Sequence, residues 1–520
     1  LPIFDWQDAY SLLSYRYCLD LPGGGGEFLI NAFGKKPNKE EFLEENIDSI
    51  PLQNVQQIIG NLMKNSFVGT VPSKFGRVMD EANDPMGLSL DVLNKNSDGS
   101  YDVKIANNGV AYMLNTVFAP PSLIAVSAPV TLSKEMKIMN EAVNDGKGGR
   151  KPLNLNVNYF AYLLAMSANY AFFIPTDDAF GRFYIDPAYL NETQPRVLKF
   201  YYDNRSPYVY CSAWKYDKTT GEIGDSLGRV STNDFRSQLV DILNYHTIVL
   251  GDGEKLGTNK YYKTKHGGEI LFEGESVRSG SQIDGNVASS GITQVYNQAN
   301  GTAYAIDHVI QPPHRSVLDI LQSDERFSEF MELCTDFDMD SIMEFASDKL
   351  VEINAVTKKR RLEAYHPFVA KGGLTDNVNY FNSYNYTVFA PDNDAMRAAY
   401  ERGLPRWSDI KVIYDEYSER LDQEKAAGEV SREVQAARDK ALAMVEEINA
   451  FIRYHFQDNS IYADNVIEEG IYPTACSDTL GIREKLTITG SAGKMTVKDK
   501  RGQQITIDAG NSSKVSNKII

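Results

Sequence analysis

The sequence predicts a protein of tandem repeated units, each of which combines β-strands with α-helices. Three observations lead to this expectation: a length of 520 residues, a composition typical of packed globular proteins, and short motifs that occur twice in the same order. With 42% hydrophobic and 24% charged residues, the chain has enough apolar side chains to build several cores. A chain of this length is expected to form about three domains.

The longest motif predicts a strand that ends two equivalent units. Asn108–Pro121 aligns without gaps to Asn300–Pro313. Both copies open with Asn-Gly, which favours a tight turn, and continue with apolar residues at every second position. Both end at a pair of prolines, which cannot extend a hydrogen-bonded ladder. The same kind of unit therefore ends twice along the chain.

A second motif, which lies earlier in the unit, predicts a buried strand followed by a capped helix. Phe172–Phe180 matches Val388–Met396. In each copy a short apolar run is broken by a proline, Pro175 or Pro391. The Asp, Thr and Asn residues that follow are favoured caps for a helix beginning near Asp178 or Asp394.

The third motif predicts a helix that ends in a Tyr-His pair. Leu243–Ile248 matches Phe451–Phe456, and each segment follows apolar residues at helical spacing. The pairs are Tyr245-His246 and Tyr454-His455. The second and third motifs keep the same order in the two units that carry them, and all three motifs occur together in residues 130–313.

In combination, the three motifs resemble the fasciclin domain. The resemblance implies an α+β fold in which a β-sandwich or wedge packs with several helices. It divides the chain into a diverged or incomplete domain at residues 1–125, a domain at residues 126–313 and a domain at residues 314–520. The first part lacks the Phe-x-Pro motif, and the alignment places Ser516–Ile520 inside the last strand of the third domain. We therefore expect that strand to be truncated.

The third domain carries a long charged helical pattern over residues 405–456. Gly428 is expected to break it into two helices. One interpretation is a helical hairpin that covers its own domain, and the other is a helix dedicated to a partner.

The Tyr-His pairs have two interpretations. In animal proteins of the family that this chain resembles, a Tyr-His segment has been proposed to contact receptors, which makes Tyr245, His246, Tyr454 and His455 candidate binding residues. Alternatively, the ring packs and the imidazole is satisfied by a backbone or carboxylate hydrogen bond at the end of its helix.

A row of aromatic residues is the other candidate binding surface. Asp203–Pro207 reads as a turn between two strands, and on the second strand Tyr210, Trp214 and Tyr216 share one face. The opposite face carries small residues such as Cys211. If the small residues face the core, the aromatic row is exposed and suits a sugar or protein partner; otherwise the row packs in a core or between domains.

Composition excludes several classes of function. The 70 acidic and 53 basic residues give a net charge of −17, which disfavours binding to nucleic acid. No apolar stretch reaches the ~20 residues of a membrane-spanning helix. The four cysteines lie far apart, without a CxxC pair, and are expected to be buried free thiols.

Motifs for enzymes, cofactors and metals are missing from the sequence. The glycines at residues 23–26 and 34 do not have phosphate-loop spacing, and Asn94–Gly99 resembles the start of a calcium loop whose twelfth position is Ile105. The six histidines show no ligand spacing. The sequence predicts no catalytic residue, no cofactor and no metal.

The leading hypothesis is therefore a non-enzymatic protein of the extracellular space or cell surface, for adhesion to or recognition of a cell-surface or matrix protein. The alternative is a glycan-binding surface lipoprotein of a nutrient-uptake system, anchored to an outer membrane after removal of its signal. The few cysteines suit a bacterial surface protein better than a disulfide-rich secreted one. The oligomeric state does not follow from the sequence.

Overall fold

The computed structural model describes most of the chain from residue 93 onward, in two large units and several short segments. We call residues 121–312 the middle unit and residues 316–508 the C-terminal unit. The described ranges are 93–107, 109–115, 121–145, 152–189, 193–205, 208–283, 288–312, 316–335, 339–347, 352–353, 360–361, 368–369, 377–378, 386–508, 514–515 and 518–519.

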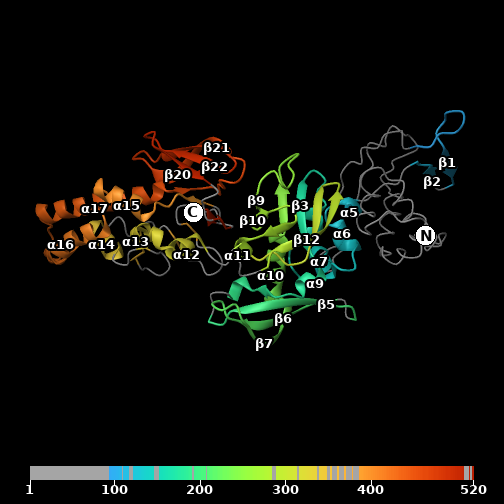
Figure 1. The fold of residues 1–520 in the computed structure, drawn as a ribbon, viewed down its shortest axis with the longest axis horizontal. Helices are drawn as coiled ribbons and strands as arrows, with labels where there is room; N and C mark the ends of the chain where they lie inside the picture. The colour runs from blue at the N-terminus through green and yellow to red at the C-terminus, as the bar shows by residue number, and fades with distance from the viewer. Residues whose placement is uncertain are drawn as a thin grey trace.

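The middle unit is built on a seven-stranded sheet with the order β8-β3-β13-β12-β11-β10-β9 (Figure 1). The strand β13 pairs parallel with β3 and antiparallel with β12. The main-chain N–H of Lys265, just after β9, donates to Thr247 O of β8 at 2.8 Å, which brings the two ends of the sheet together. The strands are β3 (Asn169–Pro175), β8 (Thr247–Leu250), β9 (Tyr261–Lys263), β10 (Glu269–Phe272), β11 (Ser276–Arg278), β12 (Ser290–Gln298) and β13 (Gly301–Ile306).

A second, four-stranded sheet of the middle unit lies apart from the first, at the bottom of Figure 1. Its order is β4-β5-β6-β7, and we call it the outer sheet. The helix α10 lies between the two sheets, and its apolar side chains share one core with both. The strands are β4 (Tyr184–Ile185), β5 (Arg196–Asp203), β6 (Tyr208–Tyr216) and β7 (Ile223–Val230). The helices of the unit are α5 (Pro121–Ile124), α6 (Ala128–Leu132), α7 (Lys137–Val143), α8 (Tyr159–Leu163), α9 (Asp177–Phe180), α10 (Thr232–Tyr245) and α11 (Gly280–Ile283), with a 3-10 turn at Pro187–Tyr189.

Asn300 of the Asn-Gly motif is buried, and its side chain makes three hydrogen bonds to main-chain groups of the helical layer. Its side-chain oxygen accepts from Val126 N at 2.8 Å, and its amide nitrogen donates to Leu163 O at 2.8 Å and to Ala165 O at 3.1 Å. The asparagine thereby ties the start of β13 to the helical layer.

The C-terminal unit combines a helical layer with a six-stranded sheet of order β18-β19-β20-β21-β22-β23. Its strands are β18 (Thr387–Val388), β19 (Phe456–Gln457), β20 (Gly470–Ser477), β21 (Arg483–Ser491), β22 (Lys494–Lys498) and β23 (Gln504–Asp508). Its helices are α12 (Val317–Gln322), α13 (Ser328–Thr335), α14 (Met339–Ala346), α15 (Asn393–Glu401), α16 (Trp407–Ala427) and α17 (Arg432–Tyr454), with a 3-10 turn at Glu325–Phe327.

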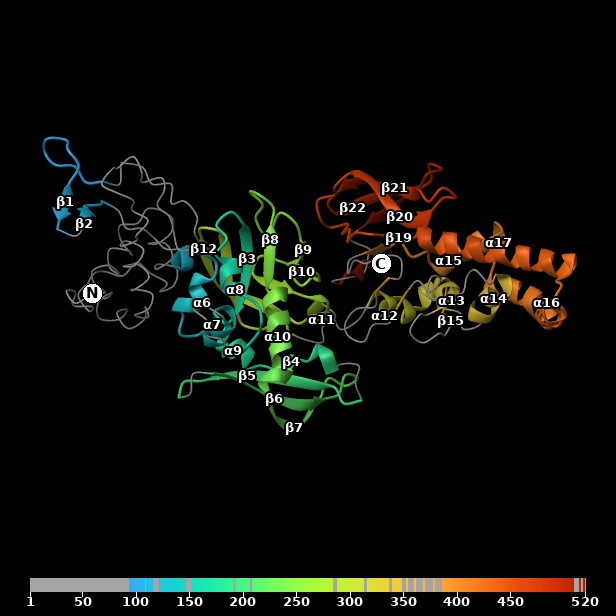
Figure 2. The ribbon, with the colours of Figure 1, turned by 180° about the vertical axis from the view of Figure 1, so that it is seen from behind.

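The long helical pattern forms an antiparallel hairpin of α16 and α17 (Figure 2). Gly428 ends α16 in the left-handed conformation, with φ of 88°, so the expected break lies where the sequence places it. Val434, Ala441, Val445 and Ile448 bury one face of α17 completely against the core of its own unit. The hairpin therefore covers its own domain.

Short two-stranded pairings complete the described chain. They are β1 (Val103–Ala106) with β2 (Gly109–Tyr112), β14 (Glu352–Ile353) with β15 (Arg360–Arg361), β16 (Phe368–Val369) with β17 (Asn377–Val378), and β24 (Lys514–Val515) with β25 (Lys518–Ile519). The expected α+β class is confirmed. Most of the predicted first domain, residues 1–125, lies outside the described residues, and the predicted domain boundaries stay a prediction.

The middle and C-terminal units touch through a small, specific contact. The rings of Tyr261 and Tyr462 stack with centroids 4.3 Å apart and an interplanar angle of 12°. The side chain of Asn465 accepts from the main-chain N–H of Lys260 and Tyr261 at 3.1 and 3.0 Å, and it donates to Tyr261 O at 3.1 Å. Lys260 also lies 3.4 Å from Asp464. The contact joins β9 of one unit to the segment that follows β19 of the other.

Glu269 makes this contact sensitive to pH. Its side chain is buried beside Tyr462, and burial raises the pKa of its carboxyl from 4.5 to about 7, against hydrogen bonds with Ser460 and Tyr462 that lower it. The folded protein therefore holds this proton up to about pH 7, whereas the unfolded chain releases it near pH 4.5. Stability therefore falls as the pH rises from about 4.5 to about 7, and above this window the buried, charged carboxylate costs the folded protein most.

We expect Glu269→Gln, which stays neutral at every pH, to stabilise the protein only above about pH 4.5. The difference in unfolding free energy between variant and wild type should be near zero at pH 4 and grow up to pH 8. Urea unfolding at a series of pH values measures it, and taking the difference cancels the other titrating groups. A difference that does not change with pH would contradict the assignment.

Candidate functional site

The outer sheet presents an aromatic face because its middle strand alternates between core and surface. On β6, Val209 and Cys211 are fully buried and Ala213 is 2% exposed, so the small residues face the core. Tyr210 and Trp214 point to the other side of the strand and are half-buried. Tyr208, Ser212 and Tyr216 lie on the same side and are also half-buried. We call this side of the outer sheet the aromatic face.

The register with β5 adds a stacked pair of rings to the aromatic face. Tyr201 of β5 lies directly opposite Tyr210, with ring centroids 5.4 Å apart and an interplanar angle of 26°. The ring of Tyr208 is tilted against that of Tyr210, with ring centroids 5.2 Å apart. Tyr201 is 45% exposed, which is unusual for a ring in a sheet. The pair offers a flat, amphipathic surface to solvent.

Two cations lie over these rings. The guanidinium of Arg229, from β7, lies 4.0 Å from the ring centre of Tyr210. The ammonium of Lys199, from β5, lies 3.9 Å from the ring centre of Phe183 and 5.6 Å from that of Trp214. Among the described residues, both cations contact the negative faces of aromatic rings, and no ion pair with a carboxylate is found for either. The aromatic face therefore carries two cations on a chain whose net charge is −17.

Trp214 and Tyr216 have a packing role as well as an exposed edge. They cover Ile185 and Val197, which form a small buried cluster on this side of the sheet. Phe183 meets Trp214 edge to face at 5.3 Å. Tyr201 and Tyr210 are therefore the better candidates for contact with a partner.

The sequence predicted that Tyr210, Trp214 and Tyr216 share one side of the strand, but it left open whether that side faces the core, and it did not predict their surroundings. Tyr201, Lys199 and Arg229 were missed because they stand on neighbouring strands, and only the register brings them to β6. One signal in the sequence could have indicated Lys199 and Tyr201. They alternate with the apolar Leu198 and Phe200, which are buried, so they are expected on the other side of the strand.

Tyr245 and His246, which the sequence names as candidate binding residues, are buried inside the middle unit. They are 3% and 0% exposed. His246 Nδ1 donates to Ile242 O at 2.7 Å, while Nε2 accepts from Ile310 N at 2.9 Å. Burial lowers the pKa of His246 to about 3, and the Tyr245 hydroxyl donates to Glu269 O at 3.1 Å. The pair holds the helix end against the sheet.

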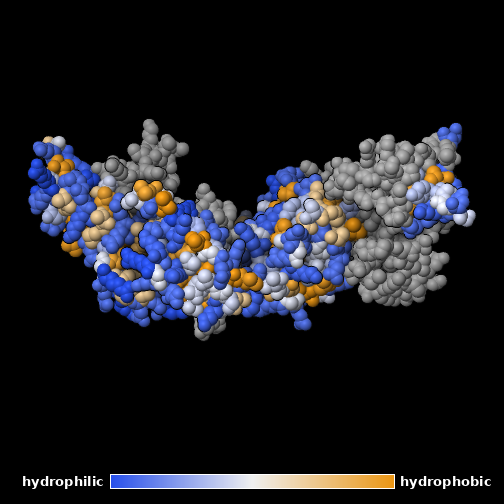
Figure 3. Space-filling model, turned by 90° about the horizontal axis from the view of Figure 1, so that it is seen from above, coloured by the Kyte–Doolittle hydropathy of each residue, from blue (hydrophilic) through white to orange (hydrophobic). Residues whose placement is uncertain are grey.

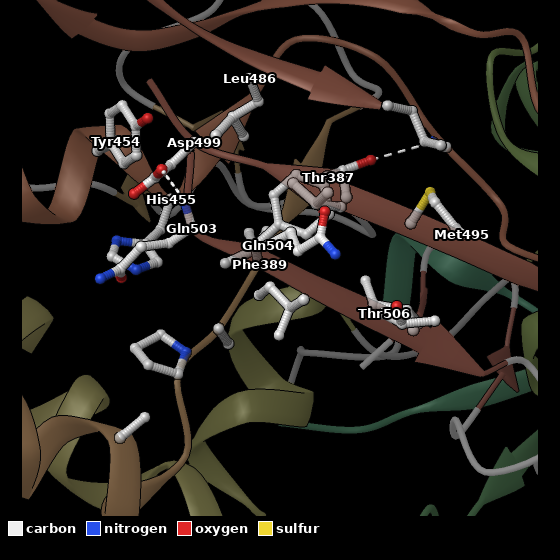
Figure 4. Close-up of a pocket in the computed structure, with 18 residues that line it drawn as sticks. Thr387, Phe389, Tyr454, His455, Leu486, Met495, Asp499, Gln503, Gln504 and Thr506 are labelled. Carbon is white, nitrogen blue, oxygen red and sulfur yellow. Dashed lines mark hydrogen bonds between the residues drawn. The ribbon is translucent and has the colours of Figure 1, made fainter. Parts of the chain in front are cut away.

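Tyr454 and His455 lie in a different environment, because they line a groove in the C-terminal unit (Figure 4). Both are half-buried. The groove encloses about 730 Å³ between β18, the end of α17 and the strands β21, β22 and β23. Its walls include Phe389, Leu486 and Met495, so it is mainly apolar.

Two kinds of reactive group, metal-binding clusters and exposed cysteine thiols, are missing from the described part of the chain. No group of three or more His, Cys, Asp or Glu side chains within it could hold a metal ion. Cys211, Cys334 and Cys476 are buried, and burial raises the pKa of the Cys211 thiol to about 12. A thiol with so high a pKa is not a nucleophile at neutral pH.

The surface seen from above is mainly hydrophilic, and its hydrophobic residues form separate small groups (Figure 3). None of the helices in the described ranges combines the length and the hydropathy that crossing a bilayer requires.

No protein-family model matches the chain, and no curated protein is significantly similar to it. Among solved structures, it is similar to a FAS1 domain pair from the insect cell adhesion molecule fasciclin I, with a match probability of 1.00. The match covers 72% of this chain and 90% of that chain, at 12% identity and a TM-score of 0.19. A TM-score this low does not place any residue of this chain on a residue of that pair.

Proposed function

We propose that the chain is a non-enzymatic recognition protein of the extracellular space or cell surface, and that its aromatic face contacts the partner. The observation that carries the proposal is the stacked pair of the exposed Tyr201 and the half-buried Tyr210, with the guanidinium of Arg229 over the ring of Tyr210. Tyrosine and arginine supply much of the binding energy at protein interfaces, since they offer a large contact area and hydrogen bonds together.

The partner that this surface suits best is a cell-surface or matrix protein with acidic side chains. The cations of Lys199 and Arg229 lie over rings, and their remaining N–H groups can bind carboxylates from a partner. The chain as a whole is acidic, so two cations on the aromatic face reduce the repulsion that an acidic partner would otherwise meet.

A glycan is the second candidate, which the exposed ring of Tyr201 favours. Sugar rings stack on flat aromatic side chains, and a surface lipoprotein of a nutrient-uptake system would use such a ring for capture. The same residues serve both candidates, so the class of partner has to come from an experiment.

Parallel arrays of matrix proteins and glycans test the proposal with the full chain and two variants. Tyr201→Ser removes an exposed ring from the aromatic face, and Ile471→Ser removes a side chain that is 68% exposed on β20 of the C-terminal unit. We expect wild type and Ile471→Ser to bind the same spots equally and Tyr201→Ser to bind them about fivefold more weakly. Equal binding by all three proteins would place the contact elsewhere. Signals on glycans alone would favour the second candidate.

A further inference from the structure

Two hairpins of the C-terminal sheet turn at the same end of that sheet, which lies at the upper right of Figure 2. A turn at residues 478–482 joins β20 to β21, and a turn at residues 499–503 joins β22 to β23. Because neighbouring strands run antiparallel, both turns lie at one end of the sheet. We call residues 477–485 together with residues 498–503 the hairpin end.

The first turn holds two large aliphatic side chains in solvent. Leu480 is 81% exposed and Ile482 is 58% exposed. The carboxylate of Asp478 accepts hydrogen bonds from the main-chain N–H groups of both residues at 2.9 Å. Gly481 has φ of 77°, and its N–H donates to Asp478 O at 3.0 Å. The turn is therefore fixed by its own hydrogen bonds while its two apolar side chains stay outside the core.

The second turn has the same main-chain design but carries a cation. The carboxylate of Asp499 accepts from Arg501 N at 2.9 Å and from Gln503 N at 2.8 Å. Gly502 has φ of 86°, and its N–H donates to Asp499 O at 3.1 Å. Arg501 therefore stands where the first turn has Leu480. The two turns are separated by one strand, or about 10 Å, so they present aliphatic and cationic groups side by side.

The hairpin end has more cations than carboxylates, on a chain whose net charge is −17. Its carboxylates already have partners within the hairpin end. Asp478 and Asp499 accept from main-chain N–H groups, and Glu484 pairs with Lys500 of the other turn. The basic residues are all exposed, and they are Arg483, Lys485, Lys498, Lys500 and Arg501. Among the described residues, no ion pair is found for Lys485, Lys498 or Arg501.

The composition of the hairpin end favours a lipid surface over a protein as its partner. Protein interfaces are rich in tyrosine, tryptophan and arginine and poor in lysine, and leucine is under-represented among their strongest contacts. The hairpin end has no aromatic residue, and most of its cations are lysines. Aliphatic side chains beside lysine and arginine are typical of surfaces that bind the interface of an anionic bilayer.

We propose that the hairpin end docks on the surface of a bilayer that contains anionic phospholipids. Leu480 and Ile482 enter the boundary between headgroups and acyl chains, and the basic side chains around them contact the headgroup phosphates. The acidic remainder of the chain does not prevent this contact, because charges more than about 8 Å away are largely screened at physiological ionic strength. This surface belongs to the C-terminal unit and is separate from the aromatic face.

Sedimentation of the full chain with lipid vesicles tests the proposal. One set of vesicles is phosphatidylcholine alone, and the other contains about 30% phosphatidylserine as the anionic lipid. We expect wild type to bind the anionic vesicles at least about tenfold more tightly than the neutral ones, because each nearby cation adds to the attraction. The difference should shrink at high salt, which screens the headgroup charge.

An apolar variant tests the role of the first turn. Leu480→Ser combined with Ile482→Ser should bind the anionic vesicles at least about tenfold more weakly than wild type, because it removes the buried aliphatic area. The matched control combines Val412→Ser with Ile471→Ser, whose side chains are 65% and 68% exposed elsewhere on the C-terminal unit, and it should bind like wild type. All four positions are exposed, and circular dichroism melting curves check that the variants fold.

A charge variant tests the cations. Replacement of Lys485, Lys498 and Arg501 by glutamine should also weaken binding to the anionic vesicles at least about tenfold. The matched control removes the same number of exposed cations from the middle unit, by replacement of Arg205, Lys218 and Lys255, and should lose much less. Tyr201→Ser should bind the vesicles like wild type, so this proposal and the proposed function can fail independently.

Four results would overturn the proposal. Wild type that binds neither kind of vesicle would show that the hairpin end is not a lipid-docking surface. Full binding by the apolar variant would show that the chain adsorbs through charge alone. Losses in the control variants as large as those in the test variants would place the contact elsewhere. Loss of matrix-protein spots by the apolar variant, without vesicle binding by wild type, would show that the hairpin end contacts a protein instead.

Discussion

Gly301→Ala is expected to cost the middle unit more than about 3 kcal/mol of stability, because no side chain fits at this position. The residue has φ of 135°, which L-residues rarely adopt. A Cβ would lie 2.0 Å from Tyr170 O and 2.6 Å from Tyr170 N, both of them main-chain atoms of β3. Relief would require β3 and β13 to separate, which breaks the parallel pairing at the centre of the sheet.

Differential scanning calorimetry of the full chain measures this loss of stability. The unfolding transition that includes the middle unit should move to a lower melting temperature. A loss of 3 kcal/mol corresponds to a shift of about 10 °C for a unit of this size. Gly221→Ala is the matched control, since Gly221 also has a positive φ of 74° but a Cβ there would meet no atom within 4 Å. It should cost only about 1 kcal/mol. Equal shifts in melting temperature for the two variants would show that Gly301 does not approach the main chain of Tyr170 as closely as the structure indicates.

The repeated motifs made the closing strand and the helix ends predictable from the sequence. Asn300 and Gly301 recur because one ties the helical layer to the strand and the other allows two main chains to approach. The helix α17 ends at Tyr454, within the third motif, because the apolar spacing continues to Ile452. Signals of this kind depend on neighbours in the sequence, which is why they can be read without the structure.

The environment of the candidate site could not be predicted in the same way, because it depends on distant residues. His246 is satisfied by Ile310 N, 64 positions away, and nothing near His246 in the sequence indicates this. The pairing of Tyr201 with Tyr210 depends on a register that the turn residues alone do not fix. The groove forms between β18 and β23, whose separation along the chain exceeds a hundred positions.

The second large effect is expected for binding rather than stability. Replacing Tyr201, Tyr210 and Arg229 together by serine should weaken binding to the partner by about 100-fold, since each central contact contributes at least about 1 kcal/mol. The fold should persist because Tyr201 and Arg229 are exposed and the core side of β6 is unchanged. By contrast, replacing Trp214 and Tyr216 would uncover Ile185 and Val197, so loss of binding there would be harder to separate from loss of stability.

The most direct test of the aromatic face as the contact surface is the dissociation constant of this triple variant for the array ligand with the strongest wild-type signal. Surface plasmon resonance measures it, with circular dichroism melting curves of both proteins taken in the same buffer. The predicted result is a dissociation constant about 100-fold higher in a variant that melts within a few degrees of wild type. An unchanged dissociation constant in a folded variant would contradict the central claim, and so would a middle unit that unfolds, because the aromatic face would then belong to the core.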